Sequence, residues 1–326
     1  MIVPQYWAEA RLQHRAQRKQ VTVRRFGWSD DSQQAAQAHA DARVREAMDG
    51  ILAGEDLPRR DHKVAYNGAE GLPIREEILS RHGDAVITRN GYGARCLNTP
   101  DVLFIDIDFD DPGPDAALRR KVRYPLLLAA VAFGVVMRSF WWGAVAVLVA
   151  LVLAYWLGQR IHRRRRARDG GPEAHAQRRI DGFASAHPDW HLRQYRTPNG
   201  FRLLALHRTF DPVEPAVKAS FDALGADGVF ALMCQRQHCF RARVSAKPWR
   251  IGITRHLRPT PGVWPINPER LPDRQRWVGH YEQVAEGYSA CRFLRTYGEG
   301  AVDPKADAVR RLHDDLCRAD STLPLA

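Results

Sequence analysis

The longest apolar stretch of the chain covers residues 124–158, where Arg138 is the only charged residue. Residues 139–158 alone are long enough, at about 1.5 Å per helical residue, to cross a bilayer core of about 30 Å. One helix over the whole stretch would measure about 50 Å, whereas two arms meeting at Arg138 would measure about 24 Å each. We therefore expect a transmembrane helical hairpin, with a single span as the alternative.

Aromatic and basic residues support the same interpretation. The candidate membrane-interface residues are Tyr124, Arg138, Trp141, Trp142, Tyr155 and Trp156. Trp and Tyr prefer membrane–water interfaces, so the central pair predicts a turn at the far headgroup layer, where Arg138 can reach water. Basic clusters at residues 119–123 and 160–168 flank the stretch on both sides, and such clusters favour the cytoplasm. Both termini are therefore expected in the cytoplasm, with the hairpin in the plasma membrane.

The flanks, residues 1–115 and 172–326, show patterns of both helices and strands. An alanine-rich run ending at Leu52 predicts a helix, and the β-branched run 102–108 predicts a buried strand. The Pro198-Asn199-Gly200 sequence predicts a β-hairpin turn. Further strands are expected at residues 229–234 and 240–245, and further helices at 212–224, at 273–297 and from 304 onward. We expect one cytosolic α+β domain that is assembled from both flanks, with the membrane hairpin inserted between them; two independent domains are the alternative.

Composition narrows the class of protein. The 326 residues are 45% hydrophobic and 26% charged, which is typical of a globular chain. The net charge is +12, but much of the excess lies beside the apolar stretch, which makes nucleic acid a less favoured partner. The five cysteines are odd in number and dispersed, unlike a disulfide framework. Residues 1–20 lack the apolar core of a signal peptide, so a reducing cytosol is expected. Cys234, His238 and Cys239 have no second ligand pair with zinc spacing, so core cysteines and a loop histidine are expected.

Asp106 and Asp108 are the candidate metal ligands. They stand two positions apart on the predicted strand, so both side chains project from one face, with Cα atoms about 6.6 Å apart. Such a pair can hold Mg²⁺ or Mn²⁺, and the cation can in turn bind a phosphate. The alternative is a strand that ends in a solvated acidic loop.

Basic residues of the second flank are candidate anion ligands. The run 240–247 alternates, which places Arg241 and Arg243 on one face of a strand, and Arg202 lies on an earlier strand. Guanidinium groups bind phosphate through two parallel hydrogen bonds. An antiparallel strand with one wet face would show the same alternation, so both interpretations stay open.

Three resemblances can be stated. An apolar strand ending in Asp106 and Asp108, with His207 on a later strand, resembles the archaeo-eukaryotic primase-polymerase superfamily. That resemblance implies a metal on the acidic pair and a nucleotide contact at His207, although the intervening membrane segment and the lack of a clear third acid depart from the pattern. Nucleotide-sugar transferases also place such an acidic pair after an apolar strand. The strings RRFGWSDDS, YRTPNGFRLL and FRARVSAKPWR resemble a family of uncharacterised transmembrane proteins of Proteobacteria, which implies the bacterial inner membrane and no particular activity.

The sequence therefore predicts a membrane protein whose basic cytosolic module binds a protein partner or an anionic ligand. The alternative is a divalent-metal enzyme that acts on a phosphate-containing, nucleotide-like substrate through Asp106 and Asp108. In that case Arg202, His207, Arg241 and Arg243 would contact the anion. Convergence of the arginines on the acidic pair would favour the enzyme. Neither catalysis nor the oligomeric state follows from the sequence.

Overall fold

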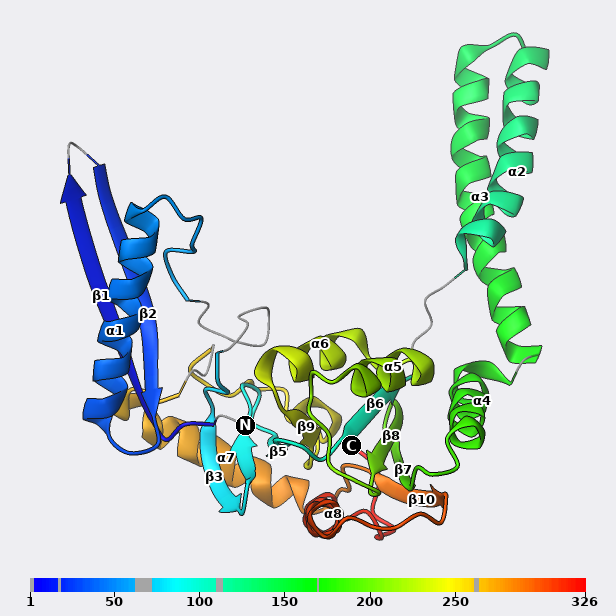
Figure 1. Cartoon of the computed structure of the whole chain (residues 1–326). Helices are drawn as coiled ribbons and strands as arrows, with labels where there is room; N and C mark the ends of the chain where they lie inside the picture. Colours follow the sequence, from blue (N-terminus) through cyan, green and yellow to red (C-terminus); the bar gives the residue numbers. More distant parts are fainter. Residues whose placement is uncertain (1–2, 17–18, 62–71, 110–113, 169, 261–263) are drawn as a thin grey trace. The chain divides into compact units, whose positions relative to one another are not determined.

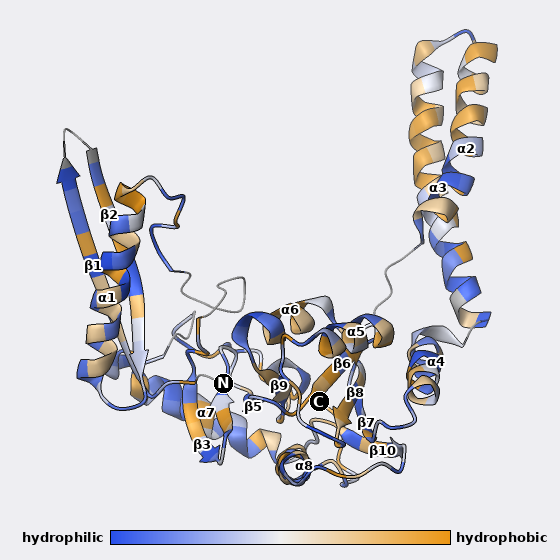
Figure 2. Cartoon of the chain, in the orientation of Figure 1, coloured by the Kyte–Doolittle hydropathy of each residue, from blue (hydrophilic) through white to orange (hydrophobic). Residues whose placement is uncertain are grey.

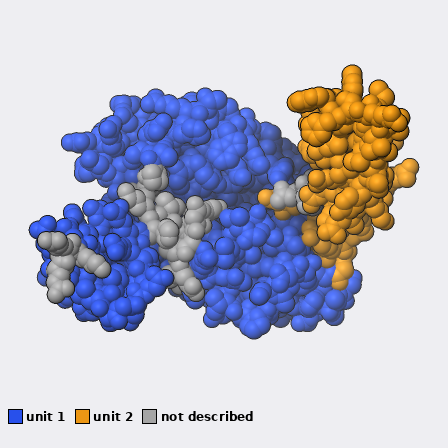
Figure 3. Space-filling view, turned by 90° about the horizontal axis from the view of Figure 1, so that it is seen from above, with its two compact units in different colours: residues 1–107, 183–326 blue, residues 108–182 orange. Residues whose placement is uncertain are grey.

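Two units make up the chain in the computed structural model, which describes residues 3–16, 19–61, 72–109, 114–168, 170–260 and 264–326. The first unit combines residues 1–107 and 183–326, and the second comprises residues 108–182 (Figure 3). The first unit contains both strands and helices, so the expected α+β class is confirmed (Figure 1).

Two four-stranded sheets form the centre of the first unit, and each contains strands from both flanks. The first sheet has the order β10-β7-β8-β6, with β10 at Arg292–Tyr297, β7 at Leu192–Thr197, β8 at Gly200–Ala205 and β6 at Phe104–Asp108. The second has the order β3-β4-β5-β9, with β3 at Glu77–His82, β4 at Ala85–Arg89, β5 at Arg95–Thr99 and β9 at Phe240–Arg243. The backbone hydrogen bond from the Ala205 amide to the Leu103 carbonyl, at 3.1 Å, joins the two flanks directly.

The predicted β-hairpin of the second flank is confirmed. β7 and β8 pair in antiparallel register across the turn, with Thr197 opposite Gly200. Tyr195 and Leu203 are fully buried, as is Phe104 on β6. The apolar run predicted as a buried strand is β6, and its burial ends at Asp108, which is exposed.

The N-terminal residues form an antiparallel pair of strands that the sequence analysis did not identify. β1 (Tyr6–Ala16) pairs with β2 (Lys19–Ser29), and helix α1 (Gln33–Leu52) packs on them through small residues such as Ala36 and Ala40. A Cβ atom at Gly27 would lie 2.1 Å from the Ala40 nitrogen, so β2 and α1 can approach this closely only with glycine there. The expected helix ending at Leu52 is confirmed.

The first unit also contains helices. They are α4 (Gly171–Ala186), which begins in the second unit, α5 (Pro215–Leu224), α6 (Gly228–Gln237), α7 (Leu271–Ala285) and α8 (Pro304–Cys317), with short 3-10 turns at Pro248–Arg250 and Pro268–Arg270. The expected helix start at Pro304 is confirmed, because the Asp303 carboxylate accepts hydrogen bonds from the Lys305 and Ala306 amides, both at 2.9 Å.

Two predicted elements are wrong. Residues 229–234, predicted as a strand, lie in α6, whose N-cap Asp227 accepts a 2.6 Å hydrogen bond from the Phe230 amide. A short apolar run does not distinguish a strand from a helix, and here Val229 is exposed while Cys234 is buried. The helix predicted over 273–297 ends at Ala285, and its last residues form β10 instead.

The second unit contains two antiparallel helices, α2 (Ala116–Val136) and α3 (Phe140–Arg168). Leu118 near the start of α2 belongs to the same apolar cluster as Ile161 near the end of α3. At the turn, a Cβ atom on Gly134 would lie 2.7 Å from the Gly143 Cα, so the helices meet through glycines. Among the described residues, α3 is the one helix long and apolar enough to cross a membrane, at Phe140–Arg165. Figure 2 shows apolar residues along both helices and polar residues toward the end where α2 begins and α3 ends.

Candidate functional site

Asp106 and Arg202 form a bidentate ion pair between β6 and β8. The Arg202 Nε donates to Asp106 Oδ1 at 2.6 Å, and Nη2 donates to Oδ2 at 2.9 Å. The Arg202 side chain is 3% exposed and that of Asp106 is 28% exposed. Desolvation by burial disfavours the Arg202 charge, but attraction to Asp106 and the hydrogen bonds outweigh it, so its pKa lies above the ordinary value. Both carboxylate oxygens of Asp106 therefore already accept charge-assisted hydrogen bonds.

The Nη1 group of Arg202 also has internal partners. Nη1 donates to the Arg243 carbonyl at 2.9 Å and lies 3.3 Å from His313 Nε2. This guanidinium is buried and each of its three nitrogens has an internal partner, so it does not offer a phosphate clamp to solvent. The metal site predicted at Asp106 and Asp108 stays a prediction; Asp108 lies at the exposed end of β6.

The other predicted anion ligands of β9 have different partners. Arg241 is buried and donates to both carboxylate oxygens of Glu76, at 2.8 and 2.6 Å. Desolvation by burial opposes its charge, but nearby groups including Glu76 raise its pKa well above the ordinary value. Arg243 donates to the carbonyls of Ser245 and Ala326. Of the three arginines, Arg202 alone contacts the acidic pair in the described part of the chain.

His207 lies in an aromatic cluster after β8. Its ring centroid is 4.6 Å from that of Trp190 and 5.4 Å from that of Phe210. Among the described residues its Nδ1 has no hydrogen-bond partner, although the atom is buried. Desolvation by burial and the charge of Arg208 lower the pKa of His207 below the ordinary value. This setting favours the neutral imidazole.

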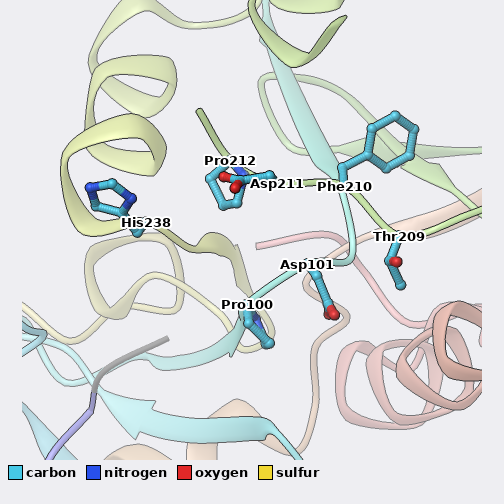
Figure 4. A pocket seen from close by; sticks show the side chains of 7 residues that line it. All are labelled: Pro100, Asp101, Thr209, Phe210, Asp211, Pro212 and His238. Atoms are coloured by element: carbon cyan, nitrogen blue, oxygen red, sulfur yellow. The ribbon is translucent and has the colours of Figure 1, made fainter. Parts of the chain in front are cut away.

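A cavity of about 390 Å³ lies next to this cluster (Figure 4). It is lined by Pro100, Asp101, Thr209, Phe210, Asp211, Pro212 and His238. Each of its acids has a partner within the fold, since Asp101 Oδ2 accepts a 2.7 Å hydrogen bond from Lys305 and Asp211 accepts one from the Val213 amide at 3.0 Å. Asp101 Oδ1 is buried without a hydrogen-bond partner among the described residues, and no cation-binding group beside it completes a site. We therefore assign it no ligand.

A larger cavity, of about 890 Å³, is distinctly basic, and we call it the basic pocket. It is lined by Gly252, Ile253, Thr254, Arg255, His256, Arg258, Pro259, Thr260, Arg270, Asp273, Arg276, Trp277 and His280. Arg270, Asp273, Trp277 and His280 recur at the spacing of one helix face, so the first turns of α7 form one wall. The loop 252–260 forms the other wall, and its Arg255 carbonyl accepts a 2.7 Å hydrogen bond from Trp277 Nε1.

The charges of the basic pocket are largely unneutralised. Four arginines line it against one aspartate, and that aspartate, Asp273, pairs with Arg276. The side chains of Arg255, Arg258 and Arg270 are exposed and form no ion pair or hydrogen bond with any residue that the structure describes. The sequence analysis missed this site because it considered alternating strands, whereas these residues lie on a loop and a helix. The helical spacing of 270, 273, 277 and 280 was the available signal.

A second group that the sequence analysis missed is fully buried. Cys291, His313 and Cys317 place their Sγ and ring nitrogen atoms within 4.8 Å of one another. The signal was the His-x-x-x-Cys spacing on α8. The expected core cysteines are confirmed, since Cys234 and Cys239 are buried and all five cysteines are free. His238 is exposed at the C-terminal cap of α6.

The predicted membrane-interface residues all lie in or beside the helices of the second unit. Tyr124 on α2 is 59% exposed and Trp141 on α3 is 77% exposed, values that are unfavourable in water for large apolar rings. Arg138 lies in the turn with a φ of 47°. Trp142, Tyr155 and Trp156 are also exposed on α3.

Comparison of the chain with protein-family models, with curated proteins and with solved structures gives no match. The three family resemblances therefore stay predictions, and the site's own geometry carries the functional argument.

Proposed function

We propose that this protein is anchored in the bacterial inner membrane and binds a phosphate-bearing ligand in the basic pocket of its cytosolic unit. The observation that carries the proposal is a set of three exposed arginines around a cavity of about 890 Å³, none of which has a side-chain partner among the described residues. Ligand pockets commonly have volumes of about 300–1,000 Å³. This function is the anion-binding one of the two that the sequence predicts.

Phosphate fits the pocket better than a carboxylate or a neutral ligand. Guanidinium groups present planar pairs of donors that match phosphate oxygens, and several arginines can share a ligand of multiple charge. The positive end of the α7 dipole lies at Arg270 and Asp273, which adds to the same potential. Trp277 supplies an apolar surface beside these charges and stacks on Tyr281 at 5.3 Å.

Sheet topology supports the membrane part of the proposal. Strands from before and after the second unit share both four-stranded sheets, so the two flanks must lie on one side of any membrane. If α3 crosses the bilayer, α2 has to return the chain, which gives a hairpin with both termini on the cytoplasmic side. The apolar part of α2, residues 124–136, is short, at about 20 Å, and local thinning or snorkelling by its basic N-terminal half would accommodate it.

Topology is tested by fusing reporters of cytoplasmic and periplasmic location to each terminus. Cytoplasmic activity of both fusions is expected. A C-terminal reporter that is active only in the periplasm would refute the hairpin and favour the single span.

Ligand binding is tested by calorimetric titration of the full chain in detergent with pyrophosphate and ATP. Losing one charge-assisted hydrogen bond costs about 1.5–3 kcal/mol, so R255Q, R258Q and R270Q should each weaken binding about 10- to 100-fold. R295Q removes an exposed arginine that does not line the pocket, so it is the matched control and should bind like the wild type.

Two further arms identify the source of the phosphate. Flotation with vesicles containing an anionic phospholipid tests for a headgroup, and an oligonucleotide tests for nucleic acid. If pyrophosphate and ATP bind, and neither the vesicles nor the oligonucleotide bind more tightly, the ligand is a small soluble phosphate. Absence of binding to every probe, or equal affinity of the three variants and the wild type, would overturn the proposal.

A further inference from the structure

Two buried cysteines and a histidine converge where β10 begins and α8 ends. Cys291 directly precedes β10, and His313 and Cys317 lie one turn apart on one face of α8. Cys291 and His313 have no exposed surface, and Cys317 is 1% exposed. The convergence therefore depends on the fold and not on one local sequence motif.

The distances within this group match the ligand spacing of a tetrahedral metal site. Bonds of about 2.3 Å to sulfur and about 2.0–2.1 Å to nitrogen place tetrahedral S and N ligands about 3.5 Å apart. The Cys317 Sγ lies 3.4 Å from His313 Nε2, and the Cys291 Sγ lies 3.8 Å from it. The third separation, between the two sulfurs, is within 4.8 Å, so a small movement would bring it near the ideal of about 3.8 Å.

The histidine is oriented as a metal ligand would be. Its Nδ1 lies 3.1 Å from Asp314 Oδ1, so a proton on Nδ1 leaves the Nε2 lone pair directed at the sulfurs. Asp314 is itself fixed, because Tyr195 donates to its Oδ1 at 2.6 Å and Arg193 lies 3.0 Å from its Oδ2. A carboxylate behind the imidazole is the usual support of a zinc-bound histidine.

The neighbouring guanidinium is compatible with a metal. Arg202 lies 3.3 Å from His313 Nε2, and Asp106 neutralises its charge. A divalent cation with two thiolates and a neutral imidazole has no net charge, so the ion pair keeps its balance. The N–H groups of Arg202 could then donate to the thiolate sulfurs.

We propose that Cys291, His313 and Cys317 bind a Zn²⁺ ion that ties β10 to α8. On binding, the two thiols lose their protons to solvent and two zinc–sulfur bonds form, so charge balances without a redox partner. The described residues supply three ligand atoms, which leaves the fourth position to water or another small ligand. A simpler arrangement, in which neutral thiols donate to the imidazole, would hold no metal.

The experiment uses the full chain in detergent, with zinc content measured after dialysis and Co²⁺ as a spectroscopic probe. One zinc per chain, thiolate-to-cobalt charge-transfer absorption and release of two protons per ion are expected. C317S should lower the zinc content at least about tenfold. C234S removes another fully buried cysteine outside the group and should keep the wild-type content.

Absence of stoichiometric zinc together with a cobalt spectrum lacking thiolate bands would overturn the proposal, as would equal zinc content in C317S and C234S. If C317S does not fold, the cobalt spectrum and the proton release of the wild type decide between metal and thiol hydrogen bonds. Loss of phosphate binding leaves both readouts unaffected, so this test is independent of the basic pocket.

Discussion

Neutralising Asp106 tests whether its carboxylate is part of the fold or a solvated strand end. D106N would leave the Arg202 guanidinium, which is 3% exposed, without its counter-ion. Removing one partner of a buried ion pair costs about 3–5 kcal/mol. The Asp106 side chain is 28% exposed, so water can reach the vacated side and the cost falls to about 2–3 kcal/mol. For a unit of roughly 250 residues, this loss lowers the melting temperature by about 4–12 °C.

Thiol labelling provides an assay that reports on this unit alone. All five cysteines are buried in the first unit, and the second unit contains none. A dye that fluoresces on reaction with thiols therefore follows unfolding of the first unit in detergent, without a signal from the helices of the second unit. D222N, at an exposed position of α5, is the matched control and should stay within about 0.5 kcal/mol of the wild type.

A double substitution separates the ion pair from general damage to β6. D106L combined with R202M replaces both charges by apolar groups, which should cost less than the sum of the two single changes. A melting temperature of D106N within about 1 °C of the wild type would refute the buried pair and restore the solvated acidic loop.

Three further outcomes are expected from the same assay. Because both Asp106 oxygens accept hydrogen bonds from Arg202, millimolar Mg²⁺ or Mn²⁺ should not raise the melting temperature. A metal bound at a hundredfold excess over its Kd would stabilise the fold by about 2.7 kcal/mol. A rise in melting temperature that D106N and D108N together abolish would therefore restore the metal hypothesis. The lowered pKa of His207 means that the unfolded chain binds more protons, so stability should fall as the pH drops through about 6.5, and H207N should flatten this dependence. G27A should destabilise the unit by several kcal/mol because its Cβ meets the backbone of α1, whereas G279A, with open space inside α7, should stabilise by about 0.5–1 kcal/mol.

The hydrophobic pattern predicted correctly those elements in which the spacing of apolar residues and the turn or capping residues at the ends indicate the same structure. The β7–β8 turn and the Asp303 cap of α8 are examples, since local chemistry fixes both. The strand predicted at residues 229–234 is wrong because six consecutive apolar residues fit both a strand and a helix. The Asp227 cap, which favours the helix, lies outside this run. The helix predicted over residues 273–297 is wrong beyond Ala285. There β10 pairs with β7, which lies about a hundred residues earlier in the chain, and this pairing overrides local helix propensity.

Candidate arginines were harder to predict, because residue type does not reveal burial. Arg202 and Arg241 were singled out for their strands, yet the structure engages them with Asp106 and Glu76. The exposed arginines of the basic pocket lie on a loop and on α7, where a pattern confined to strands has no signal. Convergence of Cys291 with His313 likewise depends on tertiary structure, since 22 positions separate them.

Arg202 connects the ion pair to the proposed zinc site, and this connection explains why an arginine is suited to the centre of β8. Its Nε and Nη2 face Asp106, while its Nη1 reaches the Arg243 carbonyl and approaches His313. A lysine ammonium could neutralise Asp106, but it lacks the planar fork of donors that lets Arg202 contact Asp106, the Arg243 carbonyl and His313 at the same time. With zinc bound, the ion and its two thiolates carry no net charge, so the Arg202 guanidinium still depends on Asp106 as its counter-ion. Because Asp106 belongs to the first flank, and Arg202 and the proposed zinc ligands to the second, this buried network joins the two parts of the chain that residues 108–182 separate.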